Sequence, residues 1–181
     1  MSAPRAYDLT QMLQKSEAFC AYQERCSAEV VDKLKRMGAE DGEILQVLNS
    51  LLDNKFLDDT RFAKAYAVGK LRIKHWGVNK IKQGLQLKRL DRELIAEAIA
   101  TMYEEENYLG ILQDIAQRKW QELHKEKDPW IRKQKLFRFL ASRGFNYDEF
   151  SDLKFEWVSR SYFDLMSVPA PVIQLFGPPA S

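Results

Sequence analysis

Residues 57 to 66, LDDTRFAKAY, and residues 75 to 85, HWGVNKIKQGL, decide the predicted fold. Asp58 and Asp59 stand where an apolar pattern with helical spacing begins. A carboxylate at that place can accept hydrogen bonds from free backbone N–H groups and favours the positive end of the helix macrodipole. The pattern predicts a helix that begins at Asp58 or Asp59 and ends near His75. Its predicted buried face comprises Phe62, Tyr66, Gly69 and Ile73.

The same stretches carry further structural features. Arg61 lies one turn from Asp58, within reach for a weak surface ion pair. Trp76 and Gly77 mark the break before the next helix, and we expect Gly77 to supply a backbone conformation that a side chain would resist. Structural roles are therefore predicted for Asp58, Asp59, Phe62, Tyr66, Trp76 and Gly77.

Proline is rare across the body of the chain. Pro4 is followed by no other proline until Pro129, and the remaining four all come after residue 168. A run of that length without proline, rich in Leu, Lys, Glu, Gln and Arg, favours helices over strands and turns. The sequence therefore predicts an all-α protein of nine amphipathic helices. One of them is capped by Ser27 and stops at Gly38, and another starts at the Asp128-Pro129 pair.

Sliding the chain against itself reveals a repeat. Val30, Leu34, Gly38 and Ile44 recur 51 positions later as Ile81, Leu85, Arg89 and Ile95, and 55 positions further on as Leu136, Leu140, Gly144 and Phe150. The interval from a helix end to the next helix core is preserved, and helical periodicity alone does not fix that interval. The sequence predicts three tandem three-helix repeats, at residues 8–55, 56–106 and 107–160, that form an elongated, curved array with cores shared between neighbours. The alternative is that any two amphipathic helix pairs align in this way.

Composition and the ends of the chain limit the classes of protein to consider. Of 181 residues, 30% are charged and 45% are hydrophobic, which is typical of soluble globular proteins. No apolar run is long enough for a signal peptide or a membrane span, so we expect a cytoplasmic protein with no membrane partner. Residues 167–181 hold four of the six prolines and predict a disordered tail, with VIQLF at residues 172 to 176 as an alternative docking peptide.

No motif predicts catalysis or a cofactor. His75 and His124 are the only histidines, and they fall in different repeats without a cysteine or paired acid at ligand spacing. Cys20 and Cys26 lie six residues apart on what reads as one helical stretch, which predicts buried free thiols rather than a disulfide or a zinc site. No glycine-rich motif for phosphate or dinucleotide binding is present. We therefore expect a protein that is not an enzyme and needs neither metal nor cofactor.

Basic residues gather in the middle of the chain. Between residues 60 and 92 there are ten basic residues and one acid, Asp91, although the whole chain has a net charge of only +2. Like charges on one helix face cost stability unless something compensates them, so the cluster favours a polyanionic or acidic partner. A merely solvated basic face is the alternative. No base-reading module is evident, so any nucleic acid should be bound through its backbone or shape. The candidate contact residues are Arg61, Lys64, Lys70, Arg72, Lys74, Lys80, Lys82, Lys88 and Arg89.

The motif resembles the signature of a known family. FLDDTRFAKAY followed by WGVNKIKQGLQLK is similar to the signature of the RecX family, bacterial regulators of the RecA recombinase. CAYQERCSAEVVDKLKRMG, residues 20 to 38, resembles the family's first repeat, and KQKLFRFLASRGF, residues 133 to 145, resembles its third. The resemblance covers about residues 10 to 155. It implies a non-enzymatic modulator that binds within the groove of the RecA filament on DNA and depresses its ATPase and strand-exchange activities. It also implies direct binding to single- or double-stranded DNA as a further candidate interaction.

Two departures from the family pattern have structural consequences. Arg89 stands where the family usually has glycine, so the turn must close differently or Arg89 must adopt a strained conformation. The tail beyond about residue 160 has no family counterpart. Our leading hypothesis is a regulator of the recombinase filament that acts by binding alone. We expect a monomer, because a terminal repeat can cap each end of the array. The alternatives are a sequence-independent nucleic-acid-binding protein and a helical-repeat scaffold with an unrelated partner.

Overall fold

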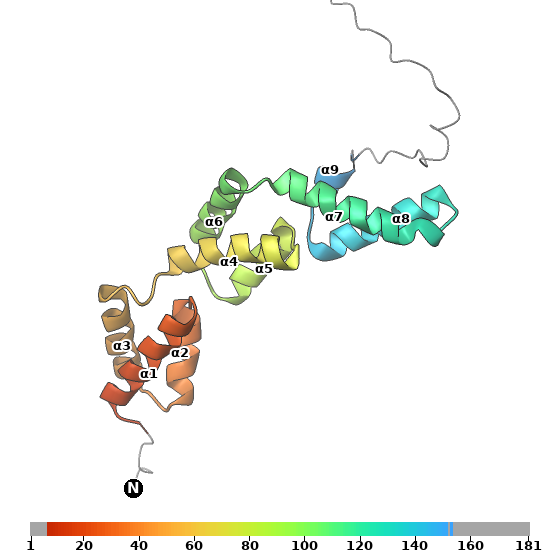
Figure 1. Ribbon diagram of the computed structural model, residues 1–181. Coiled ribbons are helices and arrows are strands. Elements are labelled where there is room, and N and C mark those ends of the chain that lie inside the picture. The colour runs from red at the N-terminus through yellow and green to blue at the C-terminus, as the bar shows by residue number, and fades with distance from the viewer. Residues whose placement is uncertain (1–6, 152, 154–181) are drawn as a thin grey trace, which may run out of the picture.

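The chain folds into helices joined by short turns. The computed structural model describes residues 7–151 and residue 153, and this part of the chain contains no strand (Figure 1). The all-α prediction is confirmed. The helices are α1 (Leu9–Tyr22), α2 (Ser27–Arg36), α3 (Asp41–Asp53), α4 (Asp59–Lys74), α5 (Val78–Leu87), α6 (Arg92–Glu105), α7 (Tyr108–Glu122), the 3-10 helix η1 (Leu123–Lys125), α8 (Pro129–Arg143) and α9 (Tyr147–Phe150).

The helices form three successive groups along an elongated, curved body (Figure 1). Helices α1, α2 and α3 pack on one another, α4, α5 and α6 form the second group, and α7 and α8 pack with α9 in the third. The predicted array of three-helix repeats is confirmed. The predicted boundaries at residues 55 and 106 stay predictions. The predicted end of the third repeat at residue 160 and the predicted tail at 167–181 lie outside the described residues.

Short polar side chains fix several helix starts. The Asp58 carboxylate accepts a hydrogen bond from the backbone N–H of Arg61 at 2.9 Å, so α4 begins where the sequence predicted. The Asp128 carboxylate accepts from the N–H of Trp130 at 2.8 Å and thereby starts α8. The prediction that Ser27 caps α2 is wrong by one position, because Cys26 is the N-cap and Ser27 is the first helical residue.

Two hydrophobic cores hold the array together. The first lies within α1, α2 and α3 and includes Met12 and Leu34. The second runs continuously through the other two repeats, from Leu71 in α4 to Leu112 in α7 and Leu140 in α8. The expected sharing of a core is therefore found between the second and third repeats, whereas the first repeat has a core of its own and contributes Cys26 to the shared one. A core that crosses a joint makes two repeats one packing unit, since neither buries its apolar face alone.

The buried face of α4 differs from the predicted one. Phe62 is buried as expected and Tyr66 is half-buried against it, with ring centroids 5.8 Å apart, but Ile73 is 74% exposed. The helix instead buries Phe62, Ala63, Ala67 and Leu71. Helix α4 packs against both α5 and α6, and the small side chains of its alanines allow the neighbouring backbones to approach closely. The spacing of Phe62 and Tyr66 thus predicted a buried face of α4 that is rotated about the helix axis from the observed one.

Candidate partner-binding surface

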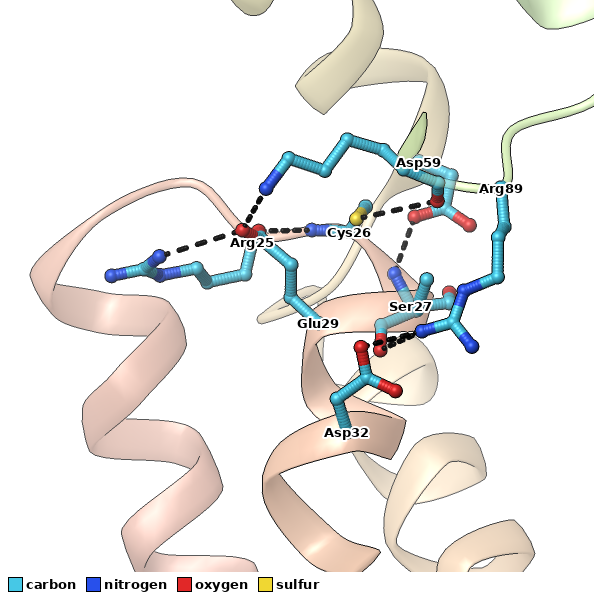
Figure 2. Close-up of polar contacts among 9 residues, drawn as sticks. Arg25, Cys26, Ser27, Glu29, Asp32, Asp59 and Arg89 are labelled. Atoms are coloured by element: carbon cyan, nitrogen blue, oxygen red, sulfur yellow. Dashed lines mark hydrogen bonds and ion pairs between the residues drawn. The ribbon is translucent and has the colours of Figure 1, made fainter. Parts of the chain in front are cut away.

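The joint between the first and second repeats is polar, and it uses residues that the sequence assigned to other roles (Figure 2). The backbone N–H of Ser27, at the start of α2, donates to the Asp59 carboxylate at 2.7 Å. Asp58 thus caps its own helix, whereas Asp59 caps a helix of the preceding repeat. Cys26 is fully buried beside this contact and belongs to the core shared by the second and third repeats. Burial raises the pKa of the Cys26 thiol.

The conformation of Arg89 shows how the turn after α5 closes without the glycine that the family usually has there. The Arg89 backbone has φ of +59°, the left-handed conformation that glycine adopts without strain, so the turn closes in the usual way with a strained residue. The Arg89 guanidinium lies 2.6 Å from the Asp32 carboxylate and donates to the backbone carbonyl of Ala28 at 3.1 Å (Figure 2). The hydrogen bond from Arg89 lowers the pKa of Asp32. The side chain therefore links the turn after α5 to α2.

Five of the nine candidate contact residues already have carboxylate partners. Each of these partners lies far from its basic residue in the sequence, and three of them belong to the first repeat. Such ion pairs cancel much of the local positive charge that the sequence indicated, although each is worth little stability at the surface. The pairs are Arg61 with Glu24 at 2.8 Å, Lys64 with Glu97 at 2.7 Å, Arg72 with Glu106 at 2.5 Å, Lys88 with Glu29 at 2.5 Å and Arg89 with Asp32.

The other four candidates have no carboxylate partner within residues 7–151 and 153. The Nζ atoms of Lys70 and Lys80 each lie 5.1 Å from the centroid of the Trp76 ring, so both ammonium groups make cation–π contacts with one indole. Lys74 is exposed one turn beyond Lys70 on α4. We call Lys70, Lys74, Trp76 and Lys80 the Trp76 cluster. Lys82 is set apart from it, since it lines a groove of about 460 Å³ between α5 and α6.

A fourth cation, which is not among the candidates predicted from the sequence, contacts the Trp76 cluster from the third repeat. The Arg143 guanidinium donates to the backbone carbonyl of Lys74 at 2.9 Å. Lys80 in turn donates to the carbonyl of Ser142 at 3.3 Å. The signal that could have found Arg143 is the composition of residues 129–143, which include five basic residues and no acid.

Gly77 fixes the joint between the second and third repeats, for a different reason from the predicted one. Its φ of −79° and ψ of 169° are available to any residue, so no special backbone conformation is needed. A Cβ at this position would instead lie 2.3 Å from the backbone nitrogen of Phe145 and 2.5 Å from the carbonyl oxygen of Gly144. The Gly77 N–H donates to the Arg143 carbonyl at 2.8 Å. Close approach of two backbones is what requires glycine here.

A pair of tyrosines, the buried Tyr108 and the partly exposed Tyr103, strengthens the same joint. The hydroxyls of Tyr103 and Tyr108 each donate to the Glu149 carboxylate at 2.9 Å, so α6 and α7 are both tied to α9. Burial, together with the hydrogen bond to Glu149, raises the pKa of Tyr103 to about 12. Burial raises the pKa of Tyr108 further. These phenols stay neutral at any physiological pH and act as fixed donors.

The described residues bear on the predictions for metal sites, thiols and membrane spans. No group of three or more His, Cys, Asp or Glu side chains among them is placed to hold a metal ion. Cys20 and Cys26 are free and buried, as predicted, although they lie on either side of the turn between α1 and α2 rather than on one helix. None of the helices in this part of the chain has both the length and the apolar character needed to cross a membrane.

Comparisons with known proteins agree with the arrangement of repeats. Residues 58–99 match the family described as RecX, second three-helix domain, and residues 105–152 match RecX, third three-helix domain. The chain is 35% identical over 122 residues to a regulatory protein RecX of Clostridium perfringens, which covers 66% of this chain and 56% of the relative. It is 31% identical over 137 residues to one of Clostridium botulinum, which covers 75% of this chain and 63% of the relative. The chain thus spans only somewhat more than half the length of these curated relatives.

Solved structures show the same fold. A crystal structure of RecX from Lactobacillus salivarius has a TM-score of 0.69 at 22% identity and covers 78% of this chain and 90% of that chain. Another crystal structure of a regulatory protein RecX has a TM-score of 0.64 at 19% identity and covers 78% of this chain and 72% of that chain. The two domain matches, the relatives and the shared helical fold together lead to one assignment. This chain belongs to the RecX family.

Proposed function

We propose that this protein is a non-enzymatic regulator of the RecA recombinase, mainly an inhibitor. It binds in the groove of the RecA filament on DNA and lowers the ATPase and strand-exchange activities, and thereby modulates recombination, DNA repair and the SOS response. Membership of the RecX family supports this proposal, since the matched relatives are named regulatory proteins. The elongated array supports it as well, because a long body suits a long polymer better than a small ligand (Figure 1).

The observation that carries the proposal is the Trp76 cluster. The indole orients Lys70 and Lys80 without neutralising them, because the ring quadrupole attracts a cation but has no net charge. Lys74 adds a third cation that no described carboxylate compensates. An acidic protein groove or a phosphate can therefore form charge-assisted hydrogen bonds here without first breaking an ion pair. The five paired basic residues, in contrast, would have to exchange partners.

The test is the steady-state ATPase rate of preassembled RecA filaments on single-stranded DNA, titrated with this protein at fixed salt. We expect the rate to fall at substoichiometric protein, and we expect excess DNA not to relieve the inhibition. A double variant, Lys70→Gln with Lys74→Gln, should require about tenfold more protein for the same inhibition, because each exposed ionic contact is worth about 0.2 to 1 kcal/mol and two are lost. Lys64→Gln is the matched control, because Lys64 already pairs with Glu97 on α6. We expect this variant to inhibit like the unaltered protein.

Other results would identify the alternatives. Inhibition that excess DNA abolishes, with a steep salt dependence of binding to DNA alone, would indicate a sequence-independent DNA-binding protein. An unchanged ATPase rate with no DNA binding would indicate a helical scaffold with an unrelated partner. Equal inhibition by the double variant and the unaltered protein would overturn the role of the Trp76 cluster.

A further inference from the structure

Helix α8 carries more positive charge than its contacts use. Residues 129–143 contain five basic side chains and no acid. Three of the five contact residues outside α8. The Arg132 guanidinium stacks on the Trp120 ring at 3.9 Å, Lys135 pairs with Glu126 at 2.6 Å, and Arg143 reaches the second repeat. The Lys133 Nζ atom lies 5.1 Å from the centroid of the Phe137 ring on the same helix, and neither Lys133 nor Arg138 has a carboxylate partner among the residues that the structure describes.

These two cations line a groove between α8 and α9. The groove is open to solvent and has a volume of about 380 Å³. Helices α8 and α9 belong to the third repeat, at the opposite end of the array from the first repeat (Figure 1). No Asp or Glu is among the residues that line the groove. Its lining includes Trp130, Lys133, Phe137, Arg138, Tyr147 and Phe150.

Two aromatic side chains of the groove are largely in solvent. Trp130 is 69% exposed and Tyr147 is 63% exposed. Tyr147 is nevertheless held in place, because its ring makes edge contacts with Phe137 and with the buried Phe150, at centroid distances of 5.8 and 5.5 Å. Trp130 lies in the first turn of α8, where Asp128 fixes its backbone N–H. The two rings are thus presented to solvent on ordered backbone and not on a long loop.

Exposed aromatic rings next to uncompensated cations match one chemical class of ligand. Single-stranded nucleic acid presents flat bases, which stack on aromatic side chains, and phosphates, which pair with Lys and Arg. An acidic peptide would satisfy Lys133 and Arg138 but supplies no regular series of planar groups for the rings. We propose that the α8–α9 groove binds single-stranded nucleic acid, with Trp130 and Tyr147 stacking on bases and Lys133 and Arg138 contacting the adjacent phosphates. This site is separate from the Trp76 cluster and goes beyond the proposed function.

The mode of binding differs from the one that the charge of the second repeat predicted. A nucleic acid held at the α8–α9 groove has its bases in contact with protein, not only its backbone. Because every base has a stackable face, such a site tolerates any sequence. Binding should therefore depend on the presence of bases and only weakly on their identity.

The experiment compares two labelled strands of equal length and charge, an oligo(dT) and the same sugar-phosphate backbone without bases. The whole protein is titrated against each strand and fluorescence anisotropy is measured. Trp130→Ala should weaken binding to oligo(dT) by about tenfold, since stacking of one base is worth about 1 to 3 kcal/mol, and should leave binding to the abasic strand unchanged. Tyr147→Ala should act in the same way, whereas Tyr147→Phe, which keeps the ring, should bind like the unaltered protein.

The two cations should behave differently from the rings. Lys133→Gln and Arg138→Gln should weaken binding to both strands and reduce the dependence of affinity on salt, because each removes about one phosphate contact. The matched controls are Leu109→Ala, an exposed apolar residue on α7, and Lys125→Gln, an exposed lysine on η1. Neither lines the groove, so both should bind like the unaltered protein. Circular dichroism of each variant establishes that it is folded.

Several results would overturn this inference. Equal affinity for oligo(dT) and the abasic strand, or unchanged oligo(dT) binding by a folded Trp130→Ala protein, would exclude base stacking in the groove. Displacement of oligo(dT) by a poly-glutamate peptide whose own binding requires Trp130 would assign the groove to an acidic protein. An oligo(rU) of the same length shows whether the ligand is DNA or RNA. These variants leave the Trp76 cluster intact. A result that excludes nucleic-acid binding in the α8–α9 groove would therefore not count against the proposed filament regulation, which the ATPase experiment tests.

Discussion

The guanidinium of Arg89 lies 2.6 Å from the carboxylate of Asp32, across the joint between the first two repeats. Arg89 makes this contact from a left-handed backbone conformation, with φ of +59°. The strain of that conformation, about 1 to 2 kcal/mol for a residue with a side chain, exceeds the typical worth of an exposed ion pair, about 0 to 1 kcal/mol. The turn itself would therefore be better served by glycine. What the arginine adds is a further tether between α2 and the second repeat, beside the contacts of Asp59 with Ser27 and of Lys88 with Glu29.

Substitution of Arg89 separates strain from tethering. Both Arg89→Gly and Arg89→Ala remove the contact with Asp32, but only glycine relieves the positive φ. We expect the glycine variant to be more stable than the alanine variant by about 1 kcal/mol in urea unfolding. Identical unfolding midpoints for the two variants would show that the turn is not strained.

Gly77→Ala should loosen the joint between the second and third repeats. The new Cβ would lie 2.3 Å from the nitrogen of Phe145, a distance that only a backbone shift can relieve. We expect a loss of about 1 to 3 kcal/mol in the free energy of unfolding, the usual cost of overpacking. Gly42→Ala is the control, since nothing lies within 4 Å of its added Cβ in the first turns of α3. The control should match or exceed the stability of the unaltered protein, and an equal loss in both variants would contradict the proposed close approach.

Adjacent aspartates should have different effects on the first joint. Asp59→Ala removes the acceptor for the Ser27 N–H and should expose Cys26, whereas Asp58→Ala removes only the cap of α4. Each loss should cost about 1 kcal/mol. Labelling of the native protein with a thiol reagent, read by mass spectrometry at each cysteine, distinguishes them. Asp59→Ala should speed the labelling of Cys26 relative to Cys20, and equal rates in the two variants would argue against the capping of α2 across the joint.

Alkaline pH should weaken the joint between the second and third repeats through Tyr103, whose hydroxyl donates to Glu149. The pKa of Tyr103 is raised from 10.0 to about 12, so its neutral form is the one that the fold prefers. The stability that this provides is complete below pH 10 and is lost as the pH rises towards 12, because the unfolded chain ionises first. Spectrophotometric titration of tyrosinate in the unaltered protein and in Tyr103→Phe should assign a group that titrates at about pH 12 to Tyr103. A titration curve that is the same in both proteins would contradict the assignment.

The helices and their order could be predicted from the sequence because local patterns specify them. Asp58 and Asp128 cap their own helices through backbone groups two or three residues away, and a proline-free run with helical spacing excludes strands. The three-helix repeat followed from the same signals. The placement of the Cys26 cap, one residue from the predicted Ser27, shows the usual limit of such rules at helix ends.

The basic surface could be only partly predicted. The excess of lysine and arginine between residues 60 and 92 is evident in the sequence, but Glu24, Glu29 and Asp32 neutralise Arg61, Lys88 and Arg89 from a different repeat. Counting charge within a segment ignores partners that are distant in sequence. The α8–α9 groove could not be predicted from the sequence for the same reason. Trp130 and Tyr147 belong to different helices and come together only when α8 and α9 pack.

The sequence by itself determined the helices, their caps and the three-helix period, because each depends on residues within one or two turns of one another. The tertiary structure alone decided which face of α4 is buried, why Gly77 must lack a side chain, and which cations remain free to meet a partner. These outcomes depend on backbones and charges that approach from other repeats, as Asp59 approaches Ser27 and Gly144 approaches Gly77. Contacts between distant segments are set by packing geometry, and no local pattern encodes that geometry.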